Sequence, residues 1–462
     1  MSNTSNSLSA GPFDSIPRTP RGHFLLHFYG AVLRLLAYVE RNGVLANTGK
    51  GTPEGDYLFL RHYREEVRHL LPEGLALEEA VPWWEDQVAA WQQGVPDPLP
   101  LAALETLPAV RVAGRSVFLL AGLVEEDSRF GTLLAHVQQP LPARRLTLGL
   151  VGALLASNGQ QASVDPWETC RGLLRMGALE TANGSAPRSE WMLHVPASVW
   201  DAARASLEQG EGSWYVLHPP AAFPALDDLV LPADLLEQLR QTPSVLGQGM
   251  VRSLILRGTP GSDRLLVAGA VAQAMGKQVI EVAATPGAPA ESGEGGPAPE
   301  LQVRPLAALC TLANALPVYT FDLAPGETAT LPELAGYTGP SIALMGPEGG
   351  LRGGLAERSL TLTLLQPDLD LRLRLWQAAL GDVPASSLAQ IAGSFILPAG
   401  YIRQAAPTAL TQARLHGRNQ PTVEDVRHAT RDLNRQVLDN LAGRVETGGS
   451  WSQLVVGIGT LA

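Results

Sequence analysis

The residues best suited to chemistry lie in one short stretch, LILRGTPGSDRLL, from Leu254 to Leu266. An apolar run, a glycine turn and the start of a helical pattern follow one another there, which is the layout of the phosphate-binding pattern G-x-x-x-x-G-K-[ST]. In that pattern, backbone N–H groups and a helix N-terminus hold the phosphates, the lysine reaches the outer phosphates, and the hydroxyl binds magnesium. The residues at these positions are Gly258, Thr259, Pro260, Gly261, Ser262, Asp263, Arg264 and Leu265.

Three positions of this loop carry residues that the pattern does not expect. Asp263 replaces the second glycine and brings a negative charge to the place of a phosphate. Arg264 replaces the lysine and keeps the positive charge on a longer, planar group. Leu265 replaces the hydroxyl residue, and a hydrocarbon side chain cannot bind a metal. The stretch is therefore either a nucleotide site released from catalysis or a glycine turn that joins a strand to a helix.

An acid at the end of a later strand favours the nucleotide site. The strand predicted over Leu316 to Leu323 places Asp322 near its end, where a carboxylate can hold magnesium through water. The next residue, Leu323, stands where a glutamate would activate the attacking water. The general base and the metal-binding hydroxyl are thus missing together. We expect weak binding of ATP or ADP at most, with Asp322 as a weak Mg²⁺ ligand, and no hydrolysis.

Other reactive residues give no stronger signal. The two lysines, Lys50 and Lys277, stand in no complete G-x-x-x-x-G-K-[ST] pattern. His23 and His27 have the i, i+4 spacing that suits zinc, but no glutamate and no third ligand accompany them, so we expect core or interface histidines. The two cysteines are far apart in the sequence, which fits a reducing compartment.

The composition describes a folded, acidic protein. Of the 462 residues, 45% are apolar and 17% are charged, which is typical of globular domains with cores. The net charge of −11 argues against a general affinity for nucleic acid or an anionic membrane, since both require clustered cations. The N-terminus lacks the pattern of a signal peptide, and apolar runs such as Leu146 to Ala156 are shorter than the ~20 residues of a membrane span. We therefore expect a cytoplasmic protein.

Periodicity and composition divide the chain into six segments. They are a loose tail at 1–20, an α-helical domain at 21–140, a winged-helix-like domain at 141–218, an α/β subdomain at 219–366 with a flexible insert at 283–300, a second helical subdomain at 367–445 and a final segment at 446–462.

Residues 141–218 show the helix, helix, hairpin order of a winged helix. Asp165 is expected to cap the second helix, Pro166 to occupy its first turn and Gly177 to end it. Six arginines against seven acids leave the segment with a net charge of −1, whereas a DNA reader needs a basic face. The pattern therefore favours a winged helix that contacts protein over one that binds DNA.

Strands that alternate with helices predict a parallel sheet in residues 219–366, with helices on both faces. The expected strands are Ser253 to Arg257, Lys277 to Val282, Leu316 to Leu323, Ser341 to Met345 and Ser359 to Leu365. The expected helices are Asp263 to Met275 and Arg304 to Asn314, and the glycine-rich turn MGPEGGLRGG follows the Ser341 strand.

The order of these segments resembles the AAA ATPases of bacteria in which a helical and winged-helix N-terminal region precedes two AAA modules. Leu226 to Arg240 (LDDLVLPADLLEQLR) resembles the linker into an AAA module. Glu357 to Leu380 resembles an arginine-bearing strand followed by the P-D-x-x-x-R…W opening of the lid. Phe395 to Ala413 resembles the lid helix with the sensor-2 motif, with Arg403 at the arginine position. The resemblance covers residues 141 to 457.

This resemblance implies a degenerate first AAA module with a helical lid at 367–445. It implies a ring, hexameric in this family, and the remodelling of protein partners; the charge balance separately disfavours nucleic acid or membrane as a partner. Arg358 stands at the place of an arginine finger, or else forms an ordinary ion pair. The polar sensor-1 residue expected near Met345 and Gly346 is absent.

The final residues, SWSQLVVGIGTLA, repeat the linker signature, and Leu454 lies 225 residues after Leu229, about one AAA module. The expectation is a linker remnant at 446–462, at the start of a second AAA module that is lost or supplied by a partner. Two other functions stay open at this point. One is an active ATPase in which Arg264 replaces the lysine, and the other is a winged-helix DNA-binding regulator.

Overall fold

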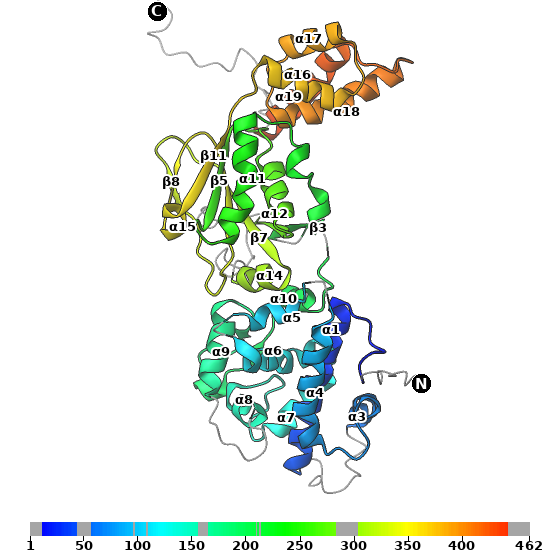
Figure 1. Cartoon of the computed structure of the whole chain (residues 1–462). Helices are drawn as coiled ribbons and strands as arrows, with labels where there is room; N and C mark the ends of the chain where they lie inside the picture. The colour runs from blue at the N-terminus through cyan, green and yellow to red at the C-terminus, as the bar shows by residue number, and fades with distance from the viewer. Residues whose placement is uncertain are drawn as a thin grey trace, which may run out of the picture. The chain divides into compact units, whose positions relative to one another are not determined.

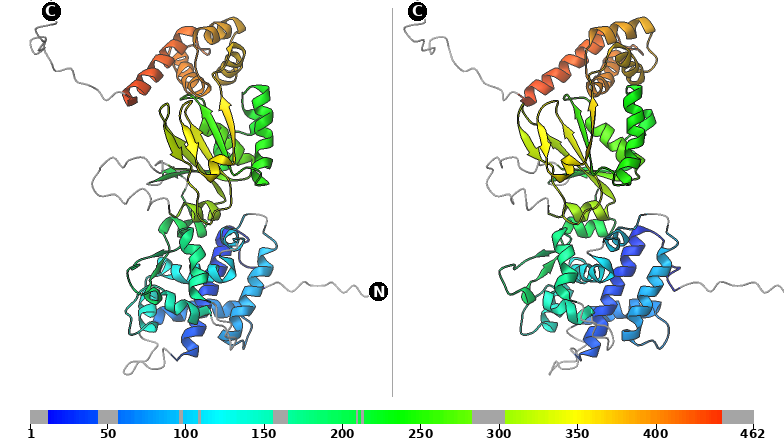
Figure 2. Two further views of the ribbon diagram at one scale, coloured as in Figure 1. Left: turned by 90° about the vertical axis from the view of Figure 1, so that its left-hand side faces the viewer. Right: turned by 60° about the vertical axis from the view of Figure 1, so that its left-hand side comes forward.

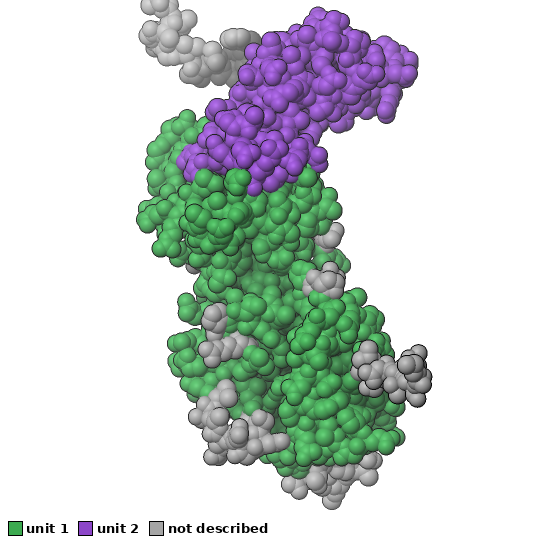
Figure 3. All heavy atoms as spheres, viewed as in Figure 1, with its two compact units in different colours: residues 1–225, 241–255, 268–360 green, residues 226–240, 256–267, 361–462 purple. Residues whose placement is uncertain are grey.

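The computed structural model describes residues 12–43, 57–95, 98–107, 110–155, 165–208, 210–211, 214–282 and 304–441. They belong to two compact units (Figure 3). The first holds residues 1–225, 241–255 and 268–360, and the second holds residues 226–240, 256–267 and 361–462. The predicted insert at 283–300, Lys50 and the predicted linker remnant at 446–462 lie outside the described residues.

Helices make up the N-terminal part of the first unit (Figure 1). They are α1 (Pro20–Arg41), α3 (Leu58–Leu70), α4 (Leu77–Gln92), α5 (Pro100–Glu105), α6 (Arg111–Glu126) and α7 (Arg129–Val137). The views in Figure 2 show α1 and α4 side by side. Trp84 of α4 is buried there, and its indole Nε1 donates a hydrogen bond to the Leu26 carbonyl of α1 at 2.9 Å.

The described end of the predicted tail is packed rather than loose. The side chain of Phe13 is only 2% exposed, and its ring lies 4.7 Å from the ring of Trp84. Thr19 then caps α1, because its hydroxyl accepts the Gly22 amide at 3.1 Å. Burial of an aromatic ring stabilises this segment, so the ordered chain begins before residue 20.

α1 is a helix of 22 residues with a mostly buried apolar surface. By length and composition it could cross a membrane, and it is the only such helix among the described residues. However, 72% of the apolar stretch of this helix is buried inside the protein, where its leucines and phenylalanines pack in the core of the first unit.

The next segment contains two helices and a short hairpin, in the order that the sequence predicts. Its elements are α8 (Leu148–Leu155), α9 (Pro166–Arg175), β1 (Glu180–Thr181), η1 (Arg188–Glu190), β2 (Leu193–His194) and α10 (Ala197–Ala203). The Asp165 carboxylate caps α9 by accepting the Trp167 amide at 2.9 Å, and Gly177 follows the helix in the left-handed conformation (φ +73°). β1 and β2 are antiparallel and only two residues long.

A seven-stranded sheet forms the α/β part, in the order β11-β5-β9-β7-β6-β4-β3. The strands are β3 (Gly210–Glu211), β4 (Tyr215–His218), β5 (Ser253–Gly258), β6 (Gln278–Val282), β7 (Ala315–Phe321), β9 (Ser341–Met345) and β11 (Ser359–Leu364). β6, β7 and β9 are parallel neighbours, whereas β4 pairs with β6 and β3 with β4 in antiparallel fashion.

The two antiparallel strands correct the predicted boundary at residue 219 and the predicted parallel sheet. β3 and β4 lie before that boundary and extend the sheet beyond β6, so the sheet is mixed. β4 alternates buried and half-buried residues, with Tyr215 and Leu217 in the core. That alternation suits a strand with one covered face, but its four residues are too few to reveal its partner.

Shorter elements and helices connect the strands. They are η2 (Pro220–Ala222), η3 (Leu226–Asp228), α11 (Ala233–Gly247), α12 (Arg264–Ala274), α14 (Leu306–Leu312) and α15 (Gly354–Glu357). The predicted glycine-rich turn contains a strand, β10 (Gly350–Arg352), which is parallel to β8 (Thr328–Thr330). The sequence does not predict this strand, because glycine is uncommon in strands and interrupts the alternation of apolar and polar residues by which strands are predicted.

Four helices close the second unit, with their own core around Trp376. They are α16 (Leu369–Leu380), α17 (Ala385–Ser394), α18 (Ala399–Leu415) and α19 (Val423–Leu441). Asp368 caps α16 by accepting the Leu371 amide at 2.8 Å. Arg372 is buried, and its guanidinium donates to the carbonyls of Ala392 and Pro367 at 3.0 and 2.8 Å. The P-D-x-x-x-R…W motif therefore has a structural role: Asp368 caps α16, and Arg372 connects α16 to α17 through the Ala392 carbonyl.

Candidate functional site

The stretch Gly258 to Leu265 has the predicted strand–loop–helix geometry. β5 ends at Gly258, and α12 begins at Arg264. Within the loop, the Ser262 amide donates to the Thr259 carbonyl at 3.1 Å, which closes a tight turn. The backbone then turns through two left-handed residues, Gly261 (φ +77°) and Asp263 (φ +65°). Glycine adopts this conformation freely and aspartate tolerates it, whereas β-branched residues do not.

The loop lies at the position where open α/β sheets bind ligands. β5 and β9 are neighbours in the sheet, but the chain leaves β5 toward β6 and leaves β9 toward β11 on the other side. As a general rule, open α/β sheets bind ligands at the carboxyl ends of strands where the strand order reverses in this way. Gly258 is at the carboxyl end of β5. At the carboxyl end of β9 stands Met345, whose side chain is fully buried and offers no polar group.

The N-terminal turn of α18 contacts this loop directly, within the second unit. The Gly400 amide donates to the Gly261 carbonyl at 2.7 Å. A Cβ atom on Gly400 would lie only 2.6 Å from that carbonyl oxygen, so this approach requires glycine. The ring of Tyr401 lies over Gly261, where a Cβ would be 2.7 Å from its Cε1 atom. The predicted sensor-2 helix is thus in contact with the predicted phosphate loop.

Asp263 and Arg403 form an ion pair across this contact. The Asp263 side chain is 13% exposed and that of Arg403 is 48% exposed, so the guanidinium covers the carboxylate from the solvent side. Burial raises the pKa of Asp263, and the charge and hydrogen bond of Arg403 oppose that rise. Both residues belong to the predicted site, but nothing in the sequence predicts that they pair with each other.

The remaining residues of the loop differ in their burial and in their hydrogen bonds. Ser262 is buried, and its hydroxyl has no hydrogen-bond partner among the described residues; the same holds for the buried hydroxyl of Thr259. Pro260 is exposed, and Arg264 and Leu265 are half-buried. Two buried hydroxyls without partners show that the loop keeps donors that a bound group could satisfy.

The residues present do not fit a magnesium nucleotide. Leu265 offers no oxygen to a cation, and the second-glycine position carries a carboxylate that would repel a phosphate. Arg403, the cation that would face the phosphates, is already paired with that carboxylate. The loop has the predicted strand–loop–helix backbone, but the charges of Asp263 and Arg403 are balanced against each other within the chain.

Asp322 and Arg358 belong to the first unit, whereas the loop belongs to the second. Asp322 is exposed and directly follows β7, as the sequence predicts, and Leu323 comes next. Arg358 is exposed between α15 and β11 and forms an ion pair with no described acidic residue. It lines a cavity of about 440 Å³ together with Arg252, Glu333 and Tyr337.

The other candidate residues take structural places. His23 and His27 are buried in α1, and their Nε2 atoms lie 2.9 Å apart. Burial lowers the pKa of His23 to about 3 and that of His27 well below its ordinary value, so both imidazoles are neutral at pH 7. Among the described residues no group of three or more metal-ligating side chains gathers. Lys277 donates to the Asn314 side chain at 2.6 Å.

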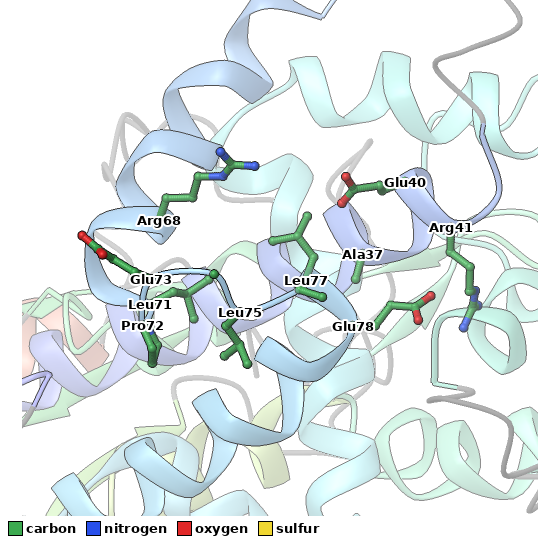
Figure 4. Close-up of a pocket in the computed structure, with 12 residues that line it drawn as sticks. Ala37, Glu40, Arg41, Arg68, Leu71, Pro72, Glu73, Leu75, Leu77 and Glu78 are labelled. Atoms are coloured by element: carbon green, nitrogen blue, oxygen red, sulfur yellow. The ribbon is translucent and has the colours of Figure 1, made fainter.

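A cavity of about 570 Å³ lies in the helical part of the first unit. It is lined by the end of α1, the end of α3 and the connection from α3 to α4. Figure 4 shows Glu40, Arg68 and Glu73 around the leucine side chains of this connection. Its described lining contains no histidine, cysteine or serine, and its charged side chains are those of Glu40, Arg41, Arg68, Glu73 and Glu78.

Two comparisons find no match: no family model and no curated protein sequence matches the chain. Among solved structures, the FIGL-1 AAA domain is similar over 50% of this chain and 93% of its own, with 14% identity and a TM-score of 0.32. The FIGL-1 AAA domain in complex with ADP is similar over 51% and 95%, with 16% identity and a TM-score of 0.33.

Proposed function

We propose that this chain is a degenerate AAA-type module that acts as a structural or regulatory component of an AAA assembly. One observation carries the proposal: the strand–loop–helix frame is intact while the groups for chemistry are replaced. The loop keeps Gly258, Gly261 and their backbone geometry. Leu265 and Leu323 stand where a metal-binding hydroxyl and a general base are needed. The frame supports an AAA-type fold, and the replacements argue against turnover.

The expected partners are other AAA subunits in a ring or a second AAA module on another chain. A module without its own base and metal ligand can still transmit conformational change when a catalytic neighbour binds nucleotide. Arg358 is the residue we expect to face such a neighbour, because it is exposed and has no described acidic partner. The exposed guanidinium is free to stabilise negative charge on another subunit.

The test is ATP hydrolysis by the purified chain, with Mg²⁺ in excess, beside the variant Arg264→Ala. We expect a rate indistinguishable from a protein-free control in both. Hydrolysis that disappears in Arg264→Ala would show an active site and overturn the proposal. The variant Arg414→Ala is a matched control, since Arg414 lies at the far end of α18 from the loop, and any contaminating ATPase would persist in it.

A further inference from the structure

The carboxylate of Asp263 lies at the N-terminus of α12 and is paired with the guanidinium of Arg403. A helix N-terminus carries partial positive charge, and a guanidinium beside it adds a full charge that offsets part of the cost of burying the carboxylate. α12 begins at the residue after Asp263, and Arg403 approaches the same carboxylate from α18. The chain therefore supplies from its own sequence the negative charge that these groups attract.

The backbone at Asp263 supports this interpretation. Its φ of +65° is the conformation of a glycine, and the phosphate-binding pattern expects a glycine there. An aspartate in this conformation keeps the path of the loop while adding a carboxylate. The Asp263 carbonyl still accepts the Val267 amide at 3.0 Å and so starts α12.

The contacts around the pair join the lid helix to the loop at three points. The first is the ion pair of Asp263 with Arg403, and the second is the bond from the Gly400 amide to the Gly261 carbonyl. The third is the ring of Tyr401 over Gly261. These three residues lie in the N-terminal turn of α18, so the contacts hold that end of the helix on the loop.

We propose that Asp263 acts as an internal anion that replaces a nucleotide phosphate and keeps α18 docked on the loop through Arg403. This inference rests on the proposed function, because it treats the loop as a former nucleotide site. As a consequence, α18 stays in contact with the loop in the absence of nucleotide, and added nucleotide does not change this contact. An added phosphate would have to displace a carboxylate that is bound to the same chain and therefore present at high effective concentration.

The test compares the full chain with Asp263→Gly, which restores the expected glycine, and Asp263→Asn, which removes only the charge. Each protein is titrated with a fluorescent ATP analogue, with and without Mg²⁺. We expect no saturation of the unmodified chain at millimolar analogue and at least about tenfold tighter binding in Asp263→Gly. Asp370→Asn is the matched control, since Asp370 is an exposed acid on α16 that pairs with Arg374.

A second measurement does not depend on nucleotide. Hydrogen exchange at the Gly400 amide, which is bonded to Gly261, reports whether α18 stays on the loop. We expect faster exchange in Asp263→Asn and Arg403→Ala than in the unmodified chain. Unchanged exchange in both variants would overturn the proposal, as would an Asp263→Gly protein that binds the analogue no better than the unmodified chain.

The outcomes separate this inference from the proposed function. Tight binding without hydrolysis by the unmodified chain would overturn the internal anion and leave the degenerate module in place. Hydrolysis by the unmodified chain would overturn the proposed function, while the Gly400 exchange would still decide whether Asp263 holds the lid helix. Gain of binding in Asp263→Gly without hydrolysis agrees with both.

Discussion

The ring of Tyr401 covers Gly261 so closely that a methyl group on this glycine would lie 2.7 Å from the Cε1 atom of the ring. Gly261 also has a φ of +77°, a backbone conformation that residues other than glycine rarely adopt. The two constraints act on the same residue, because α18 and the loop from Gly258 to Leu265 meet there. Any side chain at position 261 must therefore both strain the backbone and displace the ring of Tyr401.

We predict that Gly261→Ala lowers the free energy of unfolding by about 2–4 kcal/mol, the sum of left-handed strain and overpacking. Gly417→Ala is the control, since Gly417 also has a left-handed φ (+71°) in the second unit but nothing within 4 Å of its would-be Cβ. It is expected to lose about 1 kcal/mol. Urea unfolding of both variants measures the difference, and equal losses would show that Tyr401 does not constrain the loop.

Removal of Arg403 should lower the free energy of unfolding, because the buried carboxylate of Asp263 loses its cation. In Arg403→Ala, Asp263 stays buried without its cation, so its pKa should rise further, and we expect a loss of about 1 kcal/mol at pH 7. The loss is modest because Arg403 is half exposed. The double variant with Asp263→Asn should recover most of it, and a double-mutant cycle in urea measures the coupling.

The pH dependence of this loss has a definite sign. Burial raises the pKa of Asp263 in the folded state above its ordinary 3.8, so its protonation favours folding. The associated stability is fully present below pH 3.8 and is lost as the pH rises through the folded-state pKa. The deficit of Arg403→Ala should therefore shrink on acidification. A deficit that is independent of pH would mean that Arg403 acts by packing alone.

Arg372 should matter more than its neighbour Arg374 on the same helix. Arg372→Ala leaves two buried carbonyls without donors, so we predict a loss of about 2–4 kcal/mol. Arg374 is half exposed and pairs only with Asp370, so Arg374→Ala should change stability by less than about 0.5 kcal/mol. Thermal unfolding of the two variants checks the prediction, which fails if their melting temperatures agree.

The buried histidine pair should make the first unit sensitive to acid. Burial lowers the pKa of His23 to about 3 and lowers that of His27 as well, whereas the unfolded chain has histidines near 6.5. The unfolded state therefore takes up protons first as the pH falls below 6.5, and the free energy of unfolding falls by up to about 1.4 kcal/mol per pH unit for each histidine.

Replacement of both histidines by glutamine should flatten this slope below pH 6.5. Urea unfolding at several pH values measures the slope, with His62→Gln as the control because His62 is exposed on α3. An unchanged slope in the double variant would place the acid sensitivity elsewhere. Glutamine keeps a donor and an acceptor in the network with Gln92, so loss of packing should be small.

Local signals in the sequence predicted much of the secondary structure. The capping of α9 by Asp165 and its end at Gly177 depend on neighbouring backbone groups, so residue types alone reveal them. The β5–loop–α12 segment is equally local, because a buried apolar run, a glycine turn and a helical pattern adjoin one another. The placement of Gly258, Gly261 and Asp263 at the end of a strand followed from that pattern.

Only the tertiary structure decided how the loop is used. Asp263 and Arg403 are 140 residues apart, and no periodicity relates two residues at that distance. In the same way, β4 joins β6 and Phe13 reaches Trp84 through contacts that local patterns do not encode. Helical and strand patterns report which face of an element is apolar, whereas the partner of a charged group is chosen by which elements meet when the core forms. The sequence by itself determined a glycine turn between a strand and a helix without the residues for nucleotide chemistry, and the fold decided that Asp263 and Arg403 face each other there.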